Sequence, residues 1–438
     1  MYYLPTSRLV WLLVGGSPLW LMALVMPGGF VVGMAYLVLL GGLILHDLRA
    51  APPPHAIQVA RHLPPRLSLD TVHDVELTVH HQGDGVLTMH LRDELPAALA
   101  LLSPLPVVTL APYQTGHVRY QVRALQRGVH HCGAVVMRVE RPGALVRQQM
   151  AFPLPDAVKV YPQFVGVRDY ALLARIDQRD EVVRRPRTLR GSGTDFESLR
   201  PYVPGDDMRR VDWKASARRN TLISRNLQVE KGQQVAVLID AGRLMTEQIG
   251  ALSRFEHALN ATVMLSYVAQ QRGDSIAVAT FSNRLESFLP PTRGPRIMPR
   301  VLESLYQVQP RALESDYWQV VAEMMHLLKR RSLVIMLTDV LDTASSAGLM
   351  SNLVRAAARH LVLCVVMEDP AIVETAAVLP PDLNATYAKA AASQLILQRH
   401  LALEQMRARG ILVLESPPGR FSIQLVRRYL AIRQEDLQ

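Results

Sequence analysis

The stretch "VAVLIDAGRLM", Val235 to Met245, decides the class of the larger domain. An unbroken apolar run leads into Asp240, and the small residues Ala241 and Gly242 follow it. A continuous apolar run of this length is typical of a strand that is buried on both faces of a parallel sheet. Ligands and functional residues of such sheets gather at the carboxyl ends of the strands. We therefore treat Asp240 as a candidate functional residue.

The sequence around this stretch alternates between strands and helices from residue 233 to residue 438. Further apolar runs are "DSIAVATF", "SLVIMLTD", "LVLCVVM" and "ILVLE". Helical spacing between them predicts helices over Ser253–Arg272, Pro299–Tyr306, Asp316–Lys329, Gly348–Arg359 and Ala385–Arg409, and one from Arg420 onward. This order predicts a doubly wound α/β domain with a mostly parallel sheet over residues 233–438.

A second acid ends a strand of the same predicted sheet. Asp339 follows "VIMLT", and Asp342 comes three residues later. Carboxylates at neighbouring strand ends can hold a hard cation through their oxygens. They can equally cap the helices that follow, since acids are favoured at helix N-termini. The spacing alone leaves both interpretations open.

The N-terminus is strongly apolar. From Leu9 to Leu45 there is no charged side chain, and only "GGSP" and "MPGGF" interrupt the run. A spanning helix needs about 20 apolar residues, so residues 1–50 are predicted to form a transmembrane hairpin. A cleaved signal peptide is the alternative, but a second apolar run follows at once. Arg8 and Arg49 flank the hairpin, which by the positive-inside rule places the soluble domains in the cytoplasm.

Residues 55–165 have a period of two. "VELTVH" alternates Val75, Leu77 and Val79 on one face, "QGDG" is a turn, and "VLTMHL" resumes the alternation. This pattern predicts a small antiparallel β-sandwich. The adjacent histidines in this region point to opposite faces of a strand, so they are not expected to bind one metal ion together.

The composition limits the function further. The 438 residues exceed the size of one ordinary core, and the net charge is +10. Part of the positive charge lies between Arg184 and Arg225, where acids are interleaved with the arginines. This mixture favours internal ion pairing or a partner surface, with binding to anionic lipid or nucleic acid as the alternative. Cys132 and Cys364 are too far apart in the chain to suggest a disulfide framework.

A connecting segment, residues 166–232, contains "GSGTDFESLRPYVPGDDMRRVDWKASARRNTLISRN" at positions 191–226. This stretch resembles the signature of the bacterial membrane-anchored proteins grouped as domain of unknown function 58. The matching positions are Gly191, Gly193, Phe196, Leu199, Arg200, Tyr202, Pro204, Gly205, Asp206, Asp207, Asp212, Trp213, Lys214, Ala217 and Arg218. Its glycines, turn residues, large Trp213 and mixed charges suit a segment that docks against the α/β domain or recognises a partner.

The resemblance implies that the α/β domain is like a von Willebrand factor A module, which holds Mg²⁺ through D-x-S-x-S, a hydroxyl in a second loop and a later aspartate. In this chain Asp240 takes the first position, and Gly242 and Leu244 replace both serines. Ser315 is the candidate for the second-loop hydroxyl and Asp339 for the last aspartate. With two hydroxyl ligands missing, we expect a degenerate site with at best weak Mg²⁺ binding and no other cofactor.

No catalytic motif accompanies this site. The sequence lacks a G-x-x-x-x-G-K-[ST] loop, an H-E-x-x-H helix and a G-x-S-x-G elbow. We therefore expect a protein that is not an enzyme. The resemblance implies an adaptor in the bacterial inner membrane that works with a MoxR-type AAA+ ATPase in the assembly or maturation of membrane or envelope complexes. The alternatives are a basic lipid- or nucleic-acid-binding module, or a hydrolase that uses Asp206, Asp207 or Asp212 as acid or base.

Overall fold

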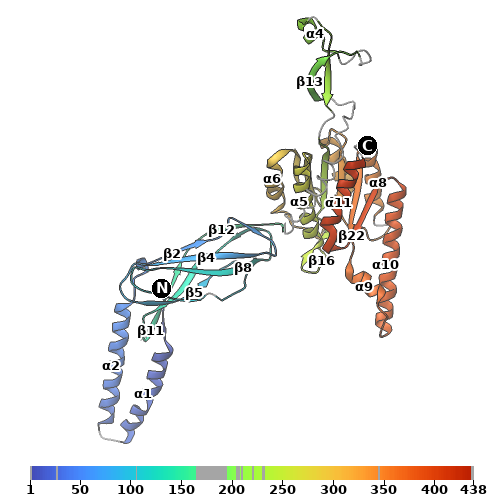
Figure 1. Ribbon diagram of the computed structural model, residues 1–438. Coiled ribbons are helices and arrows are strands. Elements are labelled where there is room, and N and C mark those ends of the chain that lie inside the picture. Colours follow the sequence, from blue (N-terminus) through green and yellow to red (C-terminus); the bar gives the residue numbers. More distant parts are fainter. Residues whose placement is uncertain are drawn as a thin grey trace. The chain divides into compact units, whose positions relative to one another are not determined.

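The computed structural model describes residues 2–25, 28–104, 106–163, 195–203, 208, 211–219, 221–228, 232–343 and 346–435 (Figure 1). The chain divides into two compact units, Met1–Gln163 and Phe164–Gln438. Each unit is built around its own buried apolar residues.

Two antiparallel helices, α1 (Ser7–Val25) and α2 (Gly29–Ala50), begin the first unit (Figure 1). The Tyr36 hydroxyl of α2 donates a hydrogen bond of 2.6 Å to the carbonyl of Leu12 in α1. Gly16 permits this close approach, because a Cβ atom there would lie 2.3 Å from the Tyr36 ring. In the described part of the chain, α2 is the one helix both long and apolar enough to cross a membrane, with a mean hydropathy of 2.0.

The start of α1 and the end of α2 are both held by one loop of the adjoining β region. Thr6, just before α1, donates its hydroxyl hydrogen bond to the carbonyl of Leu145 at 2.9 Å. Asp47, near the end of α2, accepts a hydrogen bond from the Leu145 amide at 2.5 Å. The first residues of the chain, β1 (Tyr2–Pro5), pair with a strand of that region. The chain therefore enters α1 and leaves α2 at the same end of the pair.

The β region consists mainly of two antiparallel sheets, with orders β1-β11-β10-β5-β7 and β2-β4-β8-β6. Their further strands are β2 (Ile57–His62), β4 (Val72–His81), β5 (Leu87–Asp93), β6 (Leu99–Leu101), β7 (Val107–Leu110), β8 (Thr115–Ala124), β10 (Val135–Glu140) and β11 (Val146–Phe152). A third sheet contains β3 (Arg66–Ser68), β9 (Gly128–His131) and β12 (Ala157–Tyr161).

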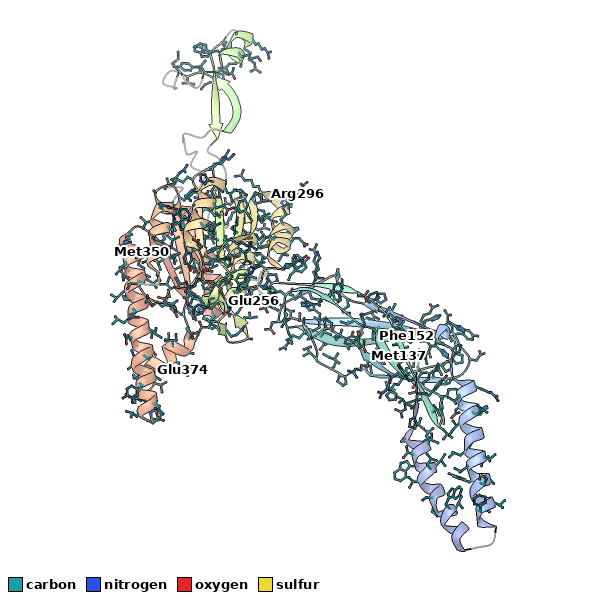
Figure 2. All side chains as sticks on the ribbon, turned by 180° about the vertical axis from the view of Figure 1, so that it is seen from behind. Met137, Phe152, Glu256, Arg296, Met350 and Glu374 are labelled. Atoms are coloured by element: carbon teal, nitrogen blue, oxygen red, sulfur yellow. The ribbon has the colours of Figure 1, made fainter. Side chains whose placement is uncertain are left out.

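The predicted alternation in this region is confirmed by the burial of its side chains. Val75, Leu77 and Val79 of β4 are fully buried and share one core with Met89 of β5 and Met137 of β10. Met137 is labelled in Figure 2. This core contains residues of both large sheets, so the two sheets face each other across it. The expectation of antiparallel strands is therefore confirmed for the two large sheets, whereas β3 and β12 of the third sheet pair in parallel.

The second unit contains the predicted α/β region, a six-stranded sheet of order β19-β18-β15-β20-β21-β22. Its strands are β15 (Gln234–Asp240), β18 (Ser275–Phe281), β19 (Leu285–Thr292), β20 (Leu333–Leu337), β21 (Leu361–Met367) and β22 (Leu412–Ser416). All neighbours are parallel except β18 and β19. The sequence did not predict β19, whose Pro290 and Pro291 suit an edge strand because proline has no amide hydrogen to donate.

Helices cover both faces of this sheet. The contacting helices are α5 (Arg254–Gln271), α6 (Ile297–Leu305) and α11 (Phe421–Glu435) on one face, and α7 (Tyr317–Leu327), α8 (Ala347–Ala357) and α10 (Leu383–Ala408) on the other. The chain turns from one half of the sheet to the other between β15 and β20. Asp240 ends the first of these strands, and Asp339 lies two residues beyond the second.

Candidate functional site

Asp240 is a buried carboxylate whose oxygens are all occupied by hydrogen bonds. Its side chain has hydrogen bonds to four donors although the residue is only 1% exposed. Ser315 Oγ donates to Oδ1 at 2.5 Å, and the amide of Gly242 donates to the same oxygen at 2.8 Å. Thr338 Oγ1 and the Tyr317 hydroxyl donate to Oδ2 at 2.6 and 2.9 Å. A buried carboxylate with this many donors is stabilised in place without a cation.

The segment that carries Ser315 is fastened to the loop after β15. The amide of Arg243 donates to the carbonyl of Leu313 at 2.8 Å, and the amide of Arg311 donates to the carbonyl of Ala241 at 2.7 Å. Asp316 then caps α7 by accepting a hydrogen bond from the amide of Gln319 at 3.0 Å. These contacts place Ser315 within hydrogen-bond distance of Asp240.

Tyr317 and Thr338 belong to the cluster, and the sequence reasoning missed both. Burial, reinforced by the charge of Asp240, raises the pKa of Tyr317 well above its usual value of 10. The phenol therefore stays protonated and continues to donate. Thr338 directly precedes Asp339 in "MLTD". A hydroxyl residue next to an acid at a strand end was the sequence signal that could have identified it.

Gly242 does not leave room for the serine of the von Willebrand pattern. A Cβ atom at this position would lie 2.1 Å from Ser315 Oγ and 2.9 Å from the carbonyl of Leu313. Ser315 thus occupies the space that a serine side chain at position 242 would need. Leu244 lies in a short 3-10 turn, Arg243–Thr246, and is partly buried.

Asp339 makes ion pairs with two arginines. The residue is 3% exposed, and Arg254 and Arg399 each approach it to 3.1 Å, on Oδ2 and Oδ1 respectively. Burial raises the pKa of Asp339, while the charges of Arg399 and Arg254 act in the opposite direction. The positive charge beside this strand end is therefore supplied by guanidinium groups of the chain.

Arg254 connects several loops at the carboxyl end of the sheet. Its side chain is 2% exposed, and it pairs with Glu247 at 2.9 Å and with Asp369 at 3.2 Å. It also donates to the carbonyl of Met367, the last residue of β21, at 3.1 Å. A buried arginine with this many partners fixes the loops relative to one another.

The residues present do not fit a Mg²⁺ site. The oxygens of Asp240 already accept from four donors, Ser315 is one of those donors, and Asp339 is paired with arginines. Across the described residues, no group of three or more His, Cys, Asp or Glu side chains is arranged to hold a metal ion. The predicted weak Mg²⁺ affinity stays a prediction for titration.

The signature positions are described only in part. Lying outside the described residues are Gly191, Gly193, Pro204, Gly205, Asp206 and Asp207. Phe196, Leu199 and Arg200 lie on β13 (Asp195–Pro201), which pairs antiparallel with β14 (Ile223–Gln228). The amide of Tyr202 donates to the carbonyl of Leu222 at 2.8 Å, which extends this pairing.

The second half of the signature forms a short helix, α4 (Trp213–Arg219). Asp212 caps it, since its Oδ1 accepts from the amide of Ala215 at 3.0 Å. Trp213 is 63% exposed, and Lys214, Ala217 and Arg218 are exposed as well. The buried member of this helix is Ser216, which accepts a hydrogen bond from the amide of Ile223 at 2.9 Å.

Comparison with known proteins agrees with the signature. Residues 198–384 match the family model described as "Protein of unknown function DUF58". The chain is similar to "Uncharacterized protein YeaD" of Bacillus subtilis, with 25% identity over 169 residues, which is 39% of this chain and 40% of that protein. It is also similar to "Uncharacterized protein Rv1480" of Mycobacterium tuberculosis, with 22% identity over 187 residues, which is 42% of this chain and 58% of that protein.

The chain therefore spans between 40% and 58% of the length of these relatives. Among solved structures, alpha-2-macroglobulin of Escherichia coli is similar to 24% of this chain and 6% of its own, with 18% identity and a TM-score of 0.19. A score this low carries no argument about fold or function.

Proposed function

We propose that this protein is a membrane-tethered, non-enzymatic adaptor whose α/β domain, of the von Willebrand factor A type, docks a MoxR-type AAA+ ATPase. In this role it would link the ATPase to membrane or envelope complexes during their assembly or maturation. The observation that carries the proposal is the closed cluster around Asp240. These buried hydrogen bonds hold together the segments that carry Gly242, Ser315 and Thr338, at the strand ends where α/β proteins bind their ligands.

The position of this cluster supports the proposal. The chain order of the sheet reverses between β15 and β20, and crevices at such switch points are the usual binding places of α/β sheets. Asp240 and Asp339 both lie there. Because Asp240 accepts hydrogen bonds from four donors and Asp339 forms ion pairs with two arginines, we propose that the loops held by these buried residues present a fixed shape to a protein partner.

The chemistry of the described residues supports a role without catalysis. Ser315 donates its hydrogen bond to a carboxylate, and no histidine of the described residues forms a hydrogen bond with it. Burial raises the pKa of Cys364 to about 12, and it also raises the pKa of Cys132. Thiols that stay protonated are poor nucleophiles.

Tethering is part of the proposal. The 22 residues of α2 are long enough for a membrane span, and α1 supplies 19 more apolar-rich residues that run antiparallel to it. We propose that both helices cross the bacterial inner membrane and that both units face the cytoplasm. The shared contact of Thr6 and Asp47 with Leu145 supports this arrangement, because it keeps both hairpin ends on one side.

Purification of the full-length protein from its own membrane tests the adaptor role. The protein is isolated in mild detergent, with and without a non-hydrolysable ATP analogue, and the co-purifying proteins are identified. We expect a AAA+ ATPase in stoichiometric amounts, enriched by the analogue and absent when residues 233–438 are deleted. A tag on the recovered ATPase should return the adaptor in the reciprocal experiment. Recovery of lipid alone would contradict the proposal.

A further inference from the structure

A pocket of about 220 Å³ opens beside the Asp339 cluster, at the carboxyl ends of β20, β21 and β22. Its walls come from α10 and from α9 (Pro370–Ala377), the short helix before it. Its apolar lining consists of Val340, Leu341, Ile372, Val373, Leu395 and Ile396. A volume of this size is below the roughly 300 to 1,000 Å³ of small-molecule and cofactor sites, so it suits one large side chain.

Part of the apolar lining is itself exposed. Val373 is 48% exposed, Leu395 is 42% exposed, and its neighbour Ile396 is 37% exposed. Exposed apolar side chains grouped beside a pocket indicate a surface that is covered in a complex. The pocket therefore has both a cavity for an anchor and an apolar margin for the residues around it.

The charged groups at this pocket are unbalanced. Arg399 pairs with Glu415 at 2.8 Å and with Asp339, and Arg254 pairs with Asp369 at 3.2 Å. Glu368, which also lines the pocket, makes no ion pair in the described part of the chain. Burial and the nearby Glu415 raise the pKa of Glu368, and Arg399 opposes the rise. A cation brought next to Glu368 would relieve this repulsion.

From this arrangement we propose that the pocket receives a segment of a partner protein in which a large apolar side chain fills the cavity and an adjacent lysine or arginine pairs with Glu368. This inference rests on the proposed adaptor function and names the chemistry that the partner must present. It is a basic and apolar ligand, in contrast to the acidic side chain that a metal-bearing von Willebrand site would select. Charge complementarity supplies the orientation, and the apolar anchor supplies most of the affinity.

Two other occupants are disfavoured by the same charges. An anionic membrane surface would be repelled by Glu368, because Asp369 and Glu415 are already paired with arginines. A second copy related by twofold symmetry would bring Glu368 towards the same acid of its partner. A basic segment of another protein meets neither penalty.

Selection of short random peptides tests this proposal without knowledge of the partner. A phage-displayed library is selected on the full-length protein in nanodiscs of phosphatidylcholine and phosphatidylglycerol, and empty nanodiscs remove membrane-binding phage. We expect the enriched sequences to pair a leucine, isoleucine or aromatic residue with a nearby lysine or arginine. Enrichment of acidic sequences, or none above the empty nanodiscs, would overturn the proposal.

Affinity measurements with an enriched peptide then locate the site. Fluorescence polarisation with Glu368→Gln should show affinity lowered about 5-fold, the equivalent of about 1 kcal/mol for a partly exposed ion pair. Leu395→Ala should weaken binding by at least as much, because it removes part of the apolar wall. The matched control is Glu374→Gln, which removes an exposed acid of α9 outside the pocket lining (Figure 2) and should leave affinity unchanged.

Wild-type affinity in both pocket variants would overturn the assignment. A changed oligomeric state in either variant would assign the pocket to a second copy and would also overturn it. The outcome is separable from that of the adaptor role. If the ATPase co-purifies equally with wild type and with both pocket variants, the adaptor role stands and the pocket proposal fails. If peptides bind as expected and no ATPase is recovered, the pocket proposal stands and the ATPase assignment fails.

Discussion

At the scale of single residues, Asp240 shows how a charged group is kept inside a sheet. A buried carboxylate is costly unless its oxygens are hydrogen-bonded. Here the donors are the Gly242 amide and the hydroxyls of Ser315, Tyr317 and Thr338. All four come from three segments that are far apart in the sequence, so the carboxylate fastens those segments together.

Replacing Asp240 by asparagine should therefore destabilise the protein. The amide NH₂ group would face hydroxyl donors, and we expect a loss of about 2 to 4 kcal/mol in the free energy of unfolding of the second unit. Denaturant titration of the full-length protein in detergent measures this loss. The control is Asp382→Asn, since Asp382 caps α10 in an exposed position and asparagine is an equally good cap. Equal stability of the two variants would contradict the assignment.

Magnesium provides a second test of the same residue. Because the acceptor sites of Asp240 are already used, millimolar Mg²⁺ should leave the unfolding midpoint unchanged. Isothermal titration should likewise give no micromolar binding. A micromolar isotherm that disappears in Asp240→Ala would show that the ion displaces the hydroxyl donors.

His257, a half-buried histidine of α5, predicts the direction of one pH effect. Burial lowers the pKa of His257 below its ordinary value of 6.5, with the backbone hydrogen bond to Ile249 opposing and Arg254 assisting. As the pH falls, the unfolded chain therefore binds a proton at His257 at a higher pH than the folded chain does. The contribution of His257 to stability is fully present above pH 6.5 and is lost as the pH falls from there through the folded pKa.

Thermal midpoints measured between neutral and mildly acidic pH test this effect. His257→Gln should reduce the loss of stability on acidification. The matched control is His326→Gln, since His326 is exposed on α7 and should leave the pH dependence unchanged. An unaltered slope in His257→Gln would contradict the assignment.

At the scale of elements, two parts of the α/β domain could not be read from the sequence. The spacing of apolar residues predicted α5, α7, α8 and α10, because their faces against the sheet repeat with the helical period. It did not predict β19, which lies at a sheet edge, or α9, in which no residue is buried. An element that buries few side chains has little periodic spacing of apolar residues, and this spacing is the signal from which helices and strands are predicted.

The N-terminal helices carry a topology prediction. If α1 and α2 cross the membrane in opposite directions, the turn at Gly28 faces the periplasm and the chain at His55 faces the cytoplasm. Alkaline phosphatase fused after Gly28 should then be active in cells, and the same enzyme fused after His55 should be inactive. Activity in both fusions would indicate a single span and place the β region outside the cytoplasm.

At the scale of the whole molecule, each unit has a core of its own. The core of the first unit includes Leu77 of β4, and the core of the second includes Leu238 of β15. Both leucines are at most 1% exposed, and no residue belongs to both clusters. Separate cores of this kind favour separate unfolding transitions.

Calorimetry of the full-length protein should therefore show two transitions. Leu77→Ala should lower one midpoint and Leu238→Ala the other, each through a loss of about 2 to 5 kcal/mol from its own core. Each variant is the control for the other. A shift of both transitions by either substitution would show that the two units unfold together.

The sequence by itself determined the apolar helices, the alternation of the antiparallel strands and the α/β order, since each depends on a period along the chain. It also identified Asp240, Ser315 and Asp339 as candidate site residues, although it had no means to pair them. Only the tertiary structure decided that Ser315 reaches Asp240 and that Asp339 turns to Arg254 and Arg399. These partners are 60 or more positions apart in the chain, and folding alone brings their polar groups within hydrogen-bond distance.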